Sequence, residues 1–475
     1  MTSKKRFLEK IEKALLDSPV VGCQLGPVKV YFVTGEASVS TVLRESSINL
    51  ISEQWMLLIL KNVAGYTDGD LAKLAVDESG IGKVPIPGKE SILAEKRICI
   101  FSMRHLVPSK FASGLKVSLF DFVRREMASA SVCSVVGKHI LNRNPDFIDM
   151  LWGYDGYAES LAFGLPSWLN KKGIKVREDL RAMCLGWYEE VEQTLSKNDK
   201  IKINSEADNP FGSQLSKELG EWAKSFDFSK ESIASVYMFL FLGEAQQISL
   251  NTNTIPVCTW ALMEIISDPD LFRATRAEVS QALVTHPTSG ERKFDIQKLA
   301  SLPLIQSIYT ESLRLHLSLN LTRTALKDIA IAGYTLPKGC TIQAPSQISH
   351  YEEAVWGTPD HRASEFWAYR HVKSSKARDA GTKSGHTLEY SISGRAGSFF
   401  PYGGGGYTCP GRNFAKQEIL LAIAMIVTRF DVEFIEWTKL DGSPSQRPAQ
   451  NDPRYAGAGS VPPDREMKVR WKRLW

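Results

Sequence analysis

The chain has 475 residues, and its 58 Lys and Arg against 53 Asp and Glu give a net charge of only +5. This near balance provides no basic stripe, so we predict no nucleic-acid partner. Hydrophobic residues make up 43% of the sequence, which is enough for a large core and excludes a disordered chain. The seven cysteines form no Cys-x-x-Cys pair, which argues against a zinc knuckle and against a dense disulfide framework.

The N-terminal residues show an amphipathic pattern without the apolar core of a signal peptide. Phe7, Ile11 and Leu15 recur at helical spacing between lysines. No run in the chain reaches the roughly 18 apolar residues that a transmembrane helix needs, so we predict no transmembrane segment. Residues 4–16 predict a helix that either contacts a membrane surface peripherally or packs on the protein body, and packing is the simpler interpretation.

Helical periodicity dominates the middle of the chain and returns near its end. The helical predictions are residues 115–260 for the most part, one long central helix over 229–266, a helix within 296–316 entered through Pro303, and a helix that begins after Gly411 and runs to about Arg429.

Short strands and polar loops separate these helices. The strand predictions are residues 26–33, three short strands over 328–343 and a last strand over 467–471, and the loop predictions are 373–397 and 441–464. The fold class is therefore predicted to be mainly α with small β-sheets. No linker divides the chain, so we predict a single domain over residues 1–475, with its β-rich parts at about 20–60 and 320–350.

One stretch carries the chemistry, the sequence FFPYGGGGYTCPGRNFA over residues 399–415. A glycine-rich loop brings Cys409 to the start of a helix, where free backbone N–H groups are expected to favour a thiolate. The glycines permit positive φ and let the backbone approach something large and flat. A phosphate cradle is excluded because no Lys-Ser or Lys-Thr follows the last glycine. A buried core thiol fits less well than an axial ligand of haem iron.

This loop resembles that of the cytochrome P-450 superfamily of haem-thiolate monooxygenases, Phe-x-x-Gly-x-Arg-x-Cys-x-Gly. Tyr402 stands at the family's Phe, Gly405 and Gly411 at its two Gly, and Cys409 at its iron ligand. Tyr407 replaces the Arg that contacts a haem propionate in the family, so the resemblance leaves that contact open. It implies the cytochrome P-450 fold and haem b as the cofactor.

A second motif lies about a hundred residues before the cysteine. Glu311 and Arg314 are three residues apart, so a helix places the carboxylate and the guanidinium on one face. As a lone feature this is usually a solvated surface pair. The resemblance identifies it as the family's Glu-x-x-Arg, with Arg370 as the third partner. Ala368 stands where the family's Phe-x-Pro-x-Arg has Pro. The implied role is structural, behind the haem.

The resemblance also implies propionate contacts outside the cysteine loop. Arg323 stands where many family members place an Arg on a haem propionate, although a strand-edge surface Arg is the alternative. No convincing Trp-x-x-x-Arg is present for the other propionate, and Arg97, Arg104 and His105 are candidates only.

The predicted central helix contains the family's oxygen site in altered form. Residues 250–254 give the best match to Ala/Gly-Gly-x-Asp/Glu-Thr, with Asn253 at the acid and Thr254 at the alcohol. An amide cannot donate and recover a proton as a carboxyl group does, but it can hydrogen-bond oxygen or water. Pro256 has no N–H, so the carbonyl of Thr252 loses its helical partner and the helix opens there. A plain kink is the alternative.

The Asn-Thr-x-Pro pattern with a Cys-Pro-Gly-Arg loop resembles one branch of the superfamily. That branch includes sterol and bile-acid hydroxylases, prostacyclin synthase and related fungal enzymes of secondary metabolism. The leading hypothesis is therefore a monooxygenase that oxidises a lipophilic substrate such as a sterol, terpenoid or other secondary metabolite. The resemblance implies O2 as co-substrate and electrons from an NADPH-dependent cytochrome reductase, because the chain has no nucleotide-binding motif of its own.

Two alternatives remain open from the residues. Asn253 in place of an acid suggests a haem-thiolate isomerase or dehydratase that needs no reductase. The departures at Tyr407 and Ala368 suggest a non-catalytic haem- or ligand-binding protein. The resemblance implies association with the endoplasmic reticulum membrane, and the missing membrane anchor makes a cytoplasmic protein the other expectation.

Overall fold

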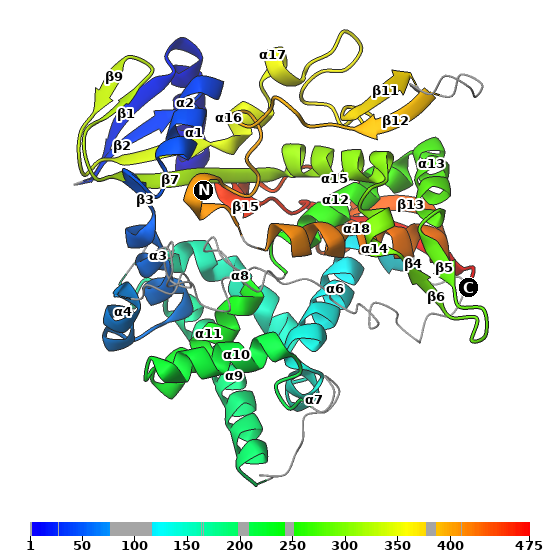
Figure 1. The fold of residues 1–475 in the computed structure, drawn as a ribbon, viewed down its shortest axis with the longest axis horizontal. Helices are drawn as coiled ribbons and strands as arrows, with labels where there is room; N and C mark the ends of the chain where they lie inside the picture. Colours follow the sequence, from blue (N-terminus) through cyan, green and yellow to red (C-terminus); the bar gives the residue numbers. More distant parts are fainter. Residues whose placement is uncertain are drawn as a thin grey trace.

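Helices build most of the molecule, and small sheets lie at its edges (Figure 1). The computed structural model describes residues 2–26, 28–76, 116–162, 164, 166–197, 209–242, 251–376, 386–409 and 411–475. The candidates Arg97, Arg104 and His105 lie outside the described residues. The prediction of a mainly α fold with small β-sheets is confirmed, whereas the single domain over residues 1–475 stays a prediction.

The helices follow one another along the chain with these bounds: α1 (Thr2–Asp17), α2 (Glu36–Glu45), α3 (Glu53–Ile59), the π-helix η1 (Leu60–Ala64), α4 (Asp68–Ala75), α6 (Leu119–Val136), α7 (His139–Arg143), α8 (Phe147–Ala162), α9 (Lys171–Lys197), α10 (Gln214–Ser225), α11 (Lys230–Leu242), α12 (Thr254–Ser267), α13 (Pro269–Ser280), α14 (Ile296–Leu299), α15 (Pro303–His316), α16 (Ser346–His350), α17 (Glu353–Trp356), the 3₁₀-helix η3 (Gly405–Tyr407), α18 (Arg412–Arg429) and η4 (Pro453–Tyr455).

The strands are mostly short and have these bounds: β1 (Val20–Leu25), β2 (Val28–Val33), β3 (Leu50–Ile51), β4 (Lys116–Ser118), β5 (Leu283–Thr285), β6 (Arg292–Phe294), β7 (Leu317–Ala325), β8 (Ile329–Ile331), β9 (Tyr334–Leu336), β10 (Thr341–Pro345), β11 (Val372–Lys376), β12 (His386–Tyr390), β13 (Phe430–Lys439), β14 (Pro444–Ser445), β15 (Ala458–Ser460) and β16 (Arg465–Arg473).

The largest sheet joins distant parts of the chain in the order β1-β2-β10-β7-β15, with β3 also paired to β7. Its β2 and β10 are parallel, and the other pairs are antiparallel. Val33, Leu321 and Ile342 form part of its core. β7 follows α15 directly, so this sheet and the main helical core share one continuous segment. Arg323 of β7 contacts Ser46, which follows α2, and Gly404 of the loop before α18.

Three helices form the centre of the molecule. α12 contacts α15, α18 and α6, and α12, α15 and α18 run nearly parallel in Figure 1. Their facing residues, including Ile255, Ile305 and Ile423, are fully buried in the largest hydrophobic cluster. α15 is buried from Leu304 to His316, so every polar side chain on it needs an internal partner. This requirement determines the environment of the Glu-x-x-Arg motif.

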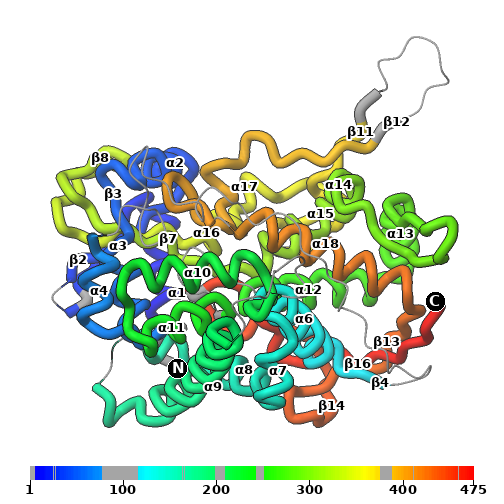
Figure 2. Tube along the Cα trace, turned by 60° about the horizontal axis from the view of Figure 1, so that its bottom comes forward, coloured from blue at the N-terminus to red at the C-terminus, as the bar shows by residue number. Residues whose placement is uncertain are grey.

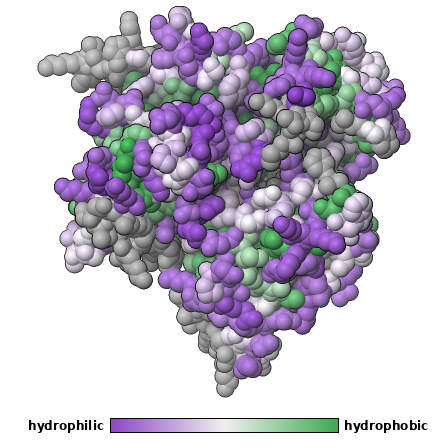
Figure 3. Space-filling model, turned by 180° about the vertical axis from the view of Figure 1, so that it is seen from behind, coloured by the Kyte–Doolittle hydropathy of each residue, from purple (hydrophilic) through white to green (hydrophobic). Residues whose placement is uncertain are grey.

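A second group of helices lies beside this centre. α8, α9 and α11 contact one another, and Figure 2 shows them on one side of α12 and α18. The face seen in Figure 3 is largely hydrophilic, with hydrophobic side chains in small separate groups. No helix in the described part of the chain combines the length and the apolar composition that crossing a bilayer requires.

Two helix predictions are confirmed in detail. α15 begins at Pro303, whose missing N–H costs nothing in the first turn of a helix. α18 begins at Arg412, directly after Gly411, and ends at Arg429 as predicted. The amphipathic N-terminal segment forms α1, and Ile11 and Leu15 are buried with residues of β2. The apolar face of α1 therefore packs on the protein body, which was the simpler of the two interpretations of this segment.

Three predictions are wrong. The loop predicted over 441–464 contains β14, η4 and β15, elements of only two or three residues each that sequence periodicity cannot reveal. The single helix over 229–266 is two helices, α11 and α12, and residues 251–253 between them are not helical. Asn251, Thr252 and Asn253 are weak helix formers, and Pro256 is tolerated only because α12 begins at Thr254 and places it in the first turn. The loop predicted over 373–397 contains the antiparallel pair β11 and β12. Its polar composition hid the strands, in which the neighbouring residues Lys373 and Ser374 are both exposed.

Candidate active site

The loop before α18 folds back on itself and presents Cys409 at the start of the helix. The backbone N–H of Cys409 donates to the carbonyl of Tyr402 at 2.9 Å, and that of Gly403 donates to Phe400 at 3.0 Å. Gly405 has φ of 64°, and a Cβ there would lie 2.3 Å from the carbonyl oxygen of Leu43. Only glycine fits this position. Gly405 therefore lets the loop backbone pass close to α2, whereas the approach to a large flat group stays a prediction.

The electrostatics of Cys409 differ from the sequence prediction. Burial raises the pKa of the thiol above its usual value, although the backbone N–H groups of Gly411 and Arg412 and the Arg412 charge lower it. The helix start therefore acts as predicted but does not outweigh burial. A thiol with a raised pKa is deprotonated when a metal ion binds it. Cys409 consequently fits a metal-bound thiolate better than a free nucleophile.

Tyr402 occupies the position of the family's Phe and adds a polar contact. Its hydroxyl is hydrogen-bonded to that of Tyr309 on α15, and burial raises the pKa of both phenols. A buried phenol needs such a partner. The pair ties the cysteine loop to α15. The sequence analysis did not find Tyr309, which stands among apolar residues and carries no motif.

Arg323 is fully buried beneath the loop instead of exposed at a strand edge. Its Nε donates to the hydroxyl of Ser46 at 3.0 Å, and one Nη donates to the carbonyl of Gly404 at 3.3 Å. The guanidinium carbon lies 4.8 Å from the centre of the Tyr407 ring. Tyr407 in turn donates to Glu53 Oε1 at 2.7 Å. Arg323, Tyr407 and Glu53 thus form one cluster beside the cysteine loop, and the sequence analysis missed Glu53.

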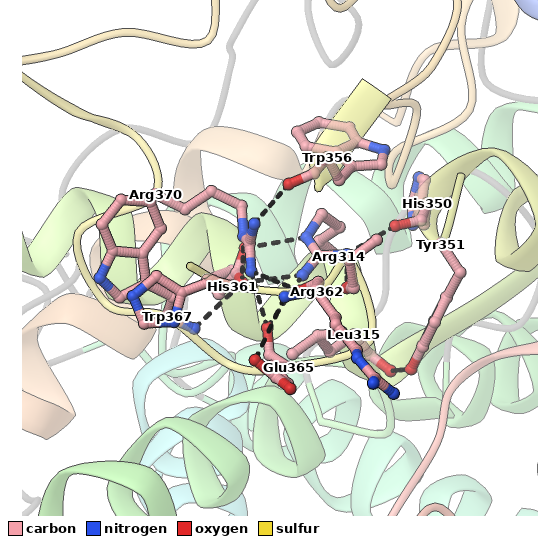
Figure 4. A network of polar contacts seen from close by, with 12 residues as sticks. Arg314, Leu315, His350, Tyr351, Trp356, His361, Arg362, Glu365, Trp367 and Arg370 are labelled. Atoms are coloured by element: carbon pink, nitrogen blue, oxygen red, sulfur yellow. Dashed lines mark hydrogen bonds and ion pairs between the residues drawn. The ribbon is translucent and has the colours of Figure 1, made fainter. Parts of the chain in front are cut away.

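The Glu-x-x-Arg network is closed as the resemblance implied. Arg314 donates to both carboxylate oxygens of Glu311 at 2.8 Å, and Arg370 donates to Oε1 at 2.7 Å. Both side chains of the first pair are fully buried. The remaining N–H groups of the two arginines donate to backbone carbonyls, including those of Trp356 and Glu365. Figure 4 shows Arg314 and Arg370 side by side among these carbonyls. A buried network of charges is stable only when every donor has an acceptor.

Burial alone would raise the pKa of Glu311, but hydrogen bonds and charges from its partners lower it to about 2. The carboxylate therefore stays ionised between its two arginines. His371 is a further partner, with Nε2 3.2 Å from Glu311 Oε2. Burial lowers the pKa of His371, although Glu311 opposes this effect. His371 directly follows Arg370, and no signal in the sequence distinguishes it.

The two side chains of the predicted oxygen site, Asn253 and Thr254, point in different directions. The Oδ1 atom of Asn253 accepts from the backbone N–H of Ser460 at 2.8 Å, so this side chain is turned towards β15. The hydroxyl of Thr254 is instead hydrogen-bonded to Glu418 on α18, which also accepts from Ser131. The structure therefore brings Thr254, but not Asn253, to the helix that follows Cys409. Glu418 was not found in the sequence analysis.

A cavity of about 530 Å³ lies against the first turn of α12. It is lined by Thr252, Asn253 and Pro256, and charged residues such as Arg124 and Asp155 form much of its wall. Thr254 points to α18 instead, so the cavity and α18 lie against different faces of α12. Cys409 is not among the residues that line this cavity.

The comparisons with known proteins now define the class of protein. The family model for cytochrome P450 matches residues 118–449. The chain therefore belongs to the cytochrome P450 family. It is a cytochrome P450 monooxygenase, an oxidoreductase whose cofactor is haem, as the resemblance of the cysteine loop implied.

Individual relatives support this assignment over the whole chain. The chain is 38% identical to cytochrome P450 monooxygenase calL of Penicillium decumbens, over 100% of this chain and 90% of the relative. It is 27% identical to cholesterol 7-alpha-monooxygenase of Cricetulus griseus, over 78% of this chain and 69% of that enzyme. The fold matches the crystal structure of the cytochrome P450DA heme domain with a TM-score of 0.62 at 15% identity, covering 97% of this chain and 91% of that one. The predicted cytochrome P-450 fold is confirmed.

Proposed function

We propose that this protein is a haem b-thiolate monooxygenase that oxidises a lipophilic small molecule with O2 and electrons from an NADPH-dependent cytochrome reductase. The observation that carries the proposal is Cys409, held at the start of α18 with the N–H groups of Gly411 and Arg412 acting on its sulfur. Haem bound through a thiolate supplies the activation of dioxygen and the cleavage of its O–O bond. The comparisons support the monooxygenase over the non-catalytic alternative.

The remaining site residues hold this arrangement in place. Gly405 lets the loop pass against α2, and Tyr402 fixes the loop to α15 through Tyr309. Arg323 is the buried cation beside the loop and would bind a haem propionate. Glu311 and its two arginines secure the segment behind the loop. Each of these contacts restricts the loop, as a cysteine that would hold the haem iron at a fixed position requires.

Thr254 and Asn253 have different tasks in this proposal. The Thr254 hydroxyl accepts and donates hydrogen bonds at the start of α12 and would order oxygen or water there. The Asn253 amide holds β15 against α12 through Ser460. Residues 251–253 are not helical, and the Asn251 carbonyl accepts from the N–H of Ile255 at 3.2 Å, so the segment joins directly onto the first turn of α12.

Substrate and location follow from the relatives and the N-terminal helix. The name of the cholesterol 7-alpha-monooxygenase relative and the fungal source of calL support a sterol, terpenoid or other secondary metabolite as substrate. Ile11 and Leu15 are buried in the protein, but Leu16 is 82% exposed, so a peripheral membrane contact through residues 4–16 would use Leu16. The location would be the endoplasmic reticulum membrane surface or the cytoplasm.

The experiment is the carbon monoxide difference spectrum of the reduced protein, with Cys409→Ala and Cys184→Ala compared. Cys184 is a fully buried thiol on α9 and serves as the matched control. We expect a strongly red-shifted Soret band in the wild type and in Cys184→Ala, and its loss in Cys409→Ala. A wild type that binds haem without this band would overturn the proposal.

One observation in the structure favours a second candidate function. With Asn253 turned to Ser460 and no acid beside Thr254 on α12, an isomerase or dehydratase that needs no external electrons remains a candidate. Product formation with purified protein, substrate and no reductase would identify it. Strict dependence on reductase and NADPH would exclude it.

A further inference from the structure

The cavity beside the first turn of α12 is separate from the surroundings of Cys409. Its volume of about 530 Å³ is typical of small-molecule sites and far larger than the space that one buried water needs. Its lining residues come from α6, α8, α12, β13, β16 and the segment between these last two strands. Thr254 is turned to α18 on the other side of α12. None of the described lining residues belongs to the cysteine loop, so the contacts that hold Cys409 do not explain this cavity.

Most charged side chains inside the cavity wall already have partners. Arg124 donates to Asp121 Oδ1 at 2.7 Å, and Arg454 Nε donates to Asp452 Oδ2 at 2.8 Å. Glu466 accepts from two backbone N–H groups at the start of α6, at 2.9 and 3.1 Å. A charged ligand would have to compete with these pairs or remain without a full counter-charge. The wall therefore favours an uncharged ligand.

Three polar side chains of the same wall have no partner among the described residues. The hydroxyls of Thr438 and Ser460 and the indole N–H of Trp152 are buried and form no hydrogen bond there. The side chains of Thr438 and Ser460 are only 2% and 5% exposed. A buried polar group without a partner is costly and usually marks a missing one. Rotation about χ1 can turn either hydroxyl towards the cavity, so a molecule bound there can supply the partner.

Asp155 adds a group that both accepts and donates. It lies three residues after Trp152 on α8, so the two side chains share one face of the helix. Both line the cavity, and no residue in the described part of the chain donates a hydrogen bond to the Asp155 carboxyl group. Burial raises the pKa of Asp155 to about 7, although the Arg124 charge lowers it. Near neutral pH both forms are present, and each can pair with a hydroxyl group.

A molecule with several hydroxyl groups matches this combination. Its hydroxyls can accept from Trp152, pair with Thr438 and Ser460 and bind Asp155 in either form. The rings of Trp152 and Tyr455, which also line the cavity, provide apolar surface for its C–H groups. We propose that this cavity is a second binding site, for an uncharged polyhydroxylated small molecule such as a sugar or a cyclic polyol. The site is independent of the proposed oxidation and does not need haem.

Occupation of this site acts on the first turn of α12. Asn253 lines the cavity and accepts from the backbone N–H of Ser460 at 2.8 Å. A ligand bound to the Ser460 hydroxyl therefore holds β15 against the start of α12, directly before Thr254. Backbone hydrogen exchange slows where local opening is suppressed. We expect the N–H groups of Ser460 and Ile255 to exchange more slowly when the site is occupied.

The test is calorimetric titration of the holoprotein with glucose, maltose and myo-inositol as uncharged probes and with citrate and spermidine as charged ones. We expect one-site binding of at least one uncharged probe with a dissociation constant below about 1 mM, and weaker binding of both charged probes. If no uncharged probe binds, the cavity holds water alone and the proposal fails. Tighter binding of citrate or spermidine at this site would also overturn it.

Thr438→Val and Ser460→Ala remove the two hydroxyls with little change of shape. We expect each to weaken the probe by about three- to tenfold, while the protein without probe keeps or gains thermal stability, because the lost group had no partner. A purely structural hydroxyl would give the reverse, a lower stability with unchanged affinity. Thr275→Val is the matched control, since it removes a fully buried hydroxyl on α13 that also has no partner among the described residues and does not line the cavity. It is expected to bind the probe as the wild type does, and wild-type affinity in both cavity variants would contradict the assignment.

Two optical readings separate this inference from the proposed function. A saturating probe is expected to leave the Soret band unchanged, and a shifted band would place the probe beside the iron instead of in this cavity. The carbon monoxide spectrum of the same sample tests the haem-thiolate proposal by itself. Probe binding without the red-shifted band would support this site and overturn that function, and the band without probe binding would do the opposite.

Discussion

His350 accepts a hydrogen bond through Nε2 from the backbone N–H of Phe400 at 3.3 Å. Its own backbone carbonyl accepts from Arg314 at 2.7 Å. One residue therefore connects the Glu-x-x-Arg network to the loop that presents Cys409. Burial and the Arg314 charge lower the pKa of His350 to about 3. The imidazole is consequently neutral at physiological pH, and Nε2 stays available as an acceptor.

The first prediction concerns His350→Ala. The change leaves the N–H of Phe400 without an acceptor and opens a cavity between Phe399 and Phe400, whose rings contact the imidazole. We expect the free energy of unfolding to fall by about 2–4 kcal/mol and haem to leave faster. Urea denaturation and haem transfer measure both effects. His139→Ala, which removes an exposed imidazole paired with Glu190, is the control and is expected to change neither by much.

The second prediction concerns Glu311→Gln. Removing one carboxylate leaves two buried arginines without a counter-charge, which is expected to cost about 3–5 kcal/mol in the free energy of unfolding. Asp270→Asn, on the exposed surface pair with Arg273, is the control and is expected to cost less than about 1 kcal/mol. Equal urea midpoints for the two variants would contradict the description of Glu311 as the centre of the network.

The pH dependence of this effect has a definite sign. The pKa of Glu311 is about 2 in the folded protein, below the value near 4.3 expected when unfolded. The unfolded chain therefore binds more protons in this range, and the stabilisation is present above about pH 4.5 and is lost as the pH falls towards 2. The difference between wild type and Glu311→Gln is expected to shrink over that window.

Most of the site that the sequence predicted lies in motifs that are local along the chain. Cys409 with its glycines, and Glu311 with Arg314, are each set within a few residues, so their spacing could be matched to the family's motifs. Arg323 and Arg370 were predicted from the resemblance alone. His350, Glu53 and Tyr309 reach the site through pairing of distant segments, for example Tyr407 with Glu53 across 354 positions. Their roles come from burial and from distant partners, and neither property leaves a pattern in a single sequence.

The central helix shows the limit of periodicity. Apolar spacing continues across residues 229–266, so the pattern predicts one helix. Helical continuity also needs backbone partners, and Pro256 removes one while the Asn253 side chain is bonded to Ser460. Both changes concern hydrogen bonds of the helix start, and the periodicity of apolar residues contains no information about hydrogen bonds. The fold class was predictable because it follows from the sum of many such segments.

The third prediction concerns Asn253. Asn253→Ala removes the acceptor for the N–H of Ser460 and is expected to cost about 1–2 kcal/mol in the free energy of unfolding, because that group is part-buried. Asn253→Asp keeps the acceptor and is expected to cost less. If both variants unfold at the same urea concentration as the wild type, the contact contributes no stability. A larger loss in Asn253→Asp than in Asn253→Ala would contradict the proposed contact.

The fourth prediction concerns Glu418, which is fully buried on α18 between Ser131 and Thr254. Burial raises its pKa to about 8, although hydrogen bonds from both hydroxyls oppose the shift. The folded protein therefore holds a proton that the unfolded chain releases near pH 4.3, and stability is expected to fall as the pH rises from about 5 to 8. Glu418→Gln keeps the shape and removes this titration, so its urea midpoint is expected to change less between these pH values.

Glu436→Gln, on the exposed side of β13, serves as the control and is expected to follow the wild type, since its charge is solvated in both states. A wild-type midpoint that does not fall over this range relative to Glu418→Gln would show that the carboxyl group is ionised in the folded protein.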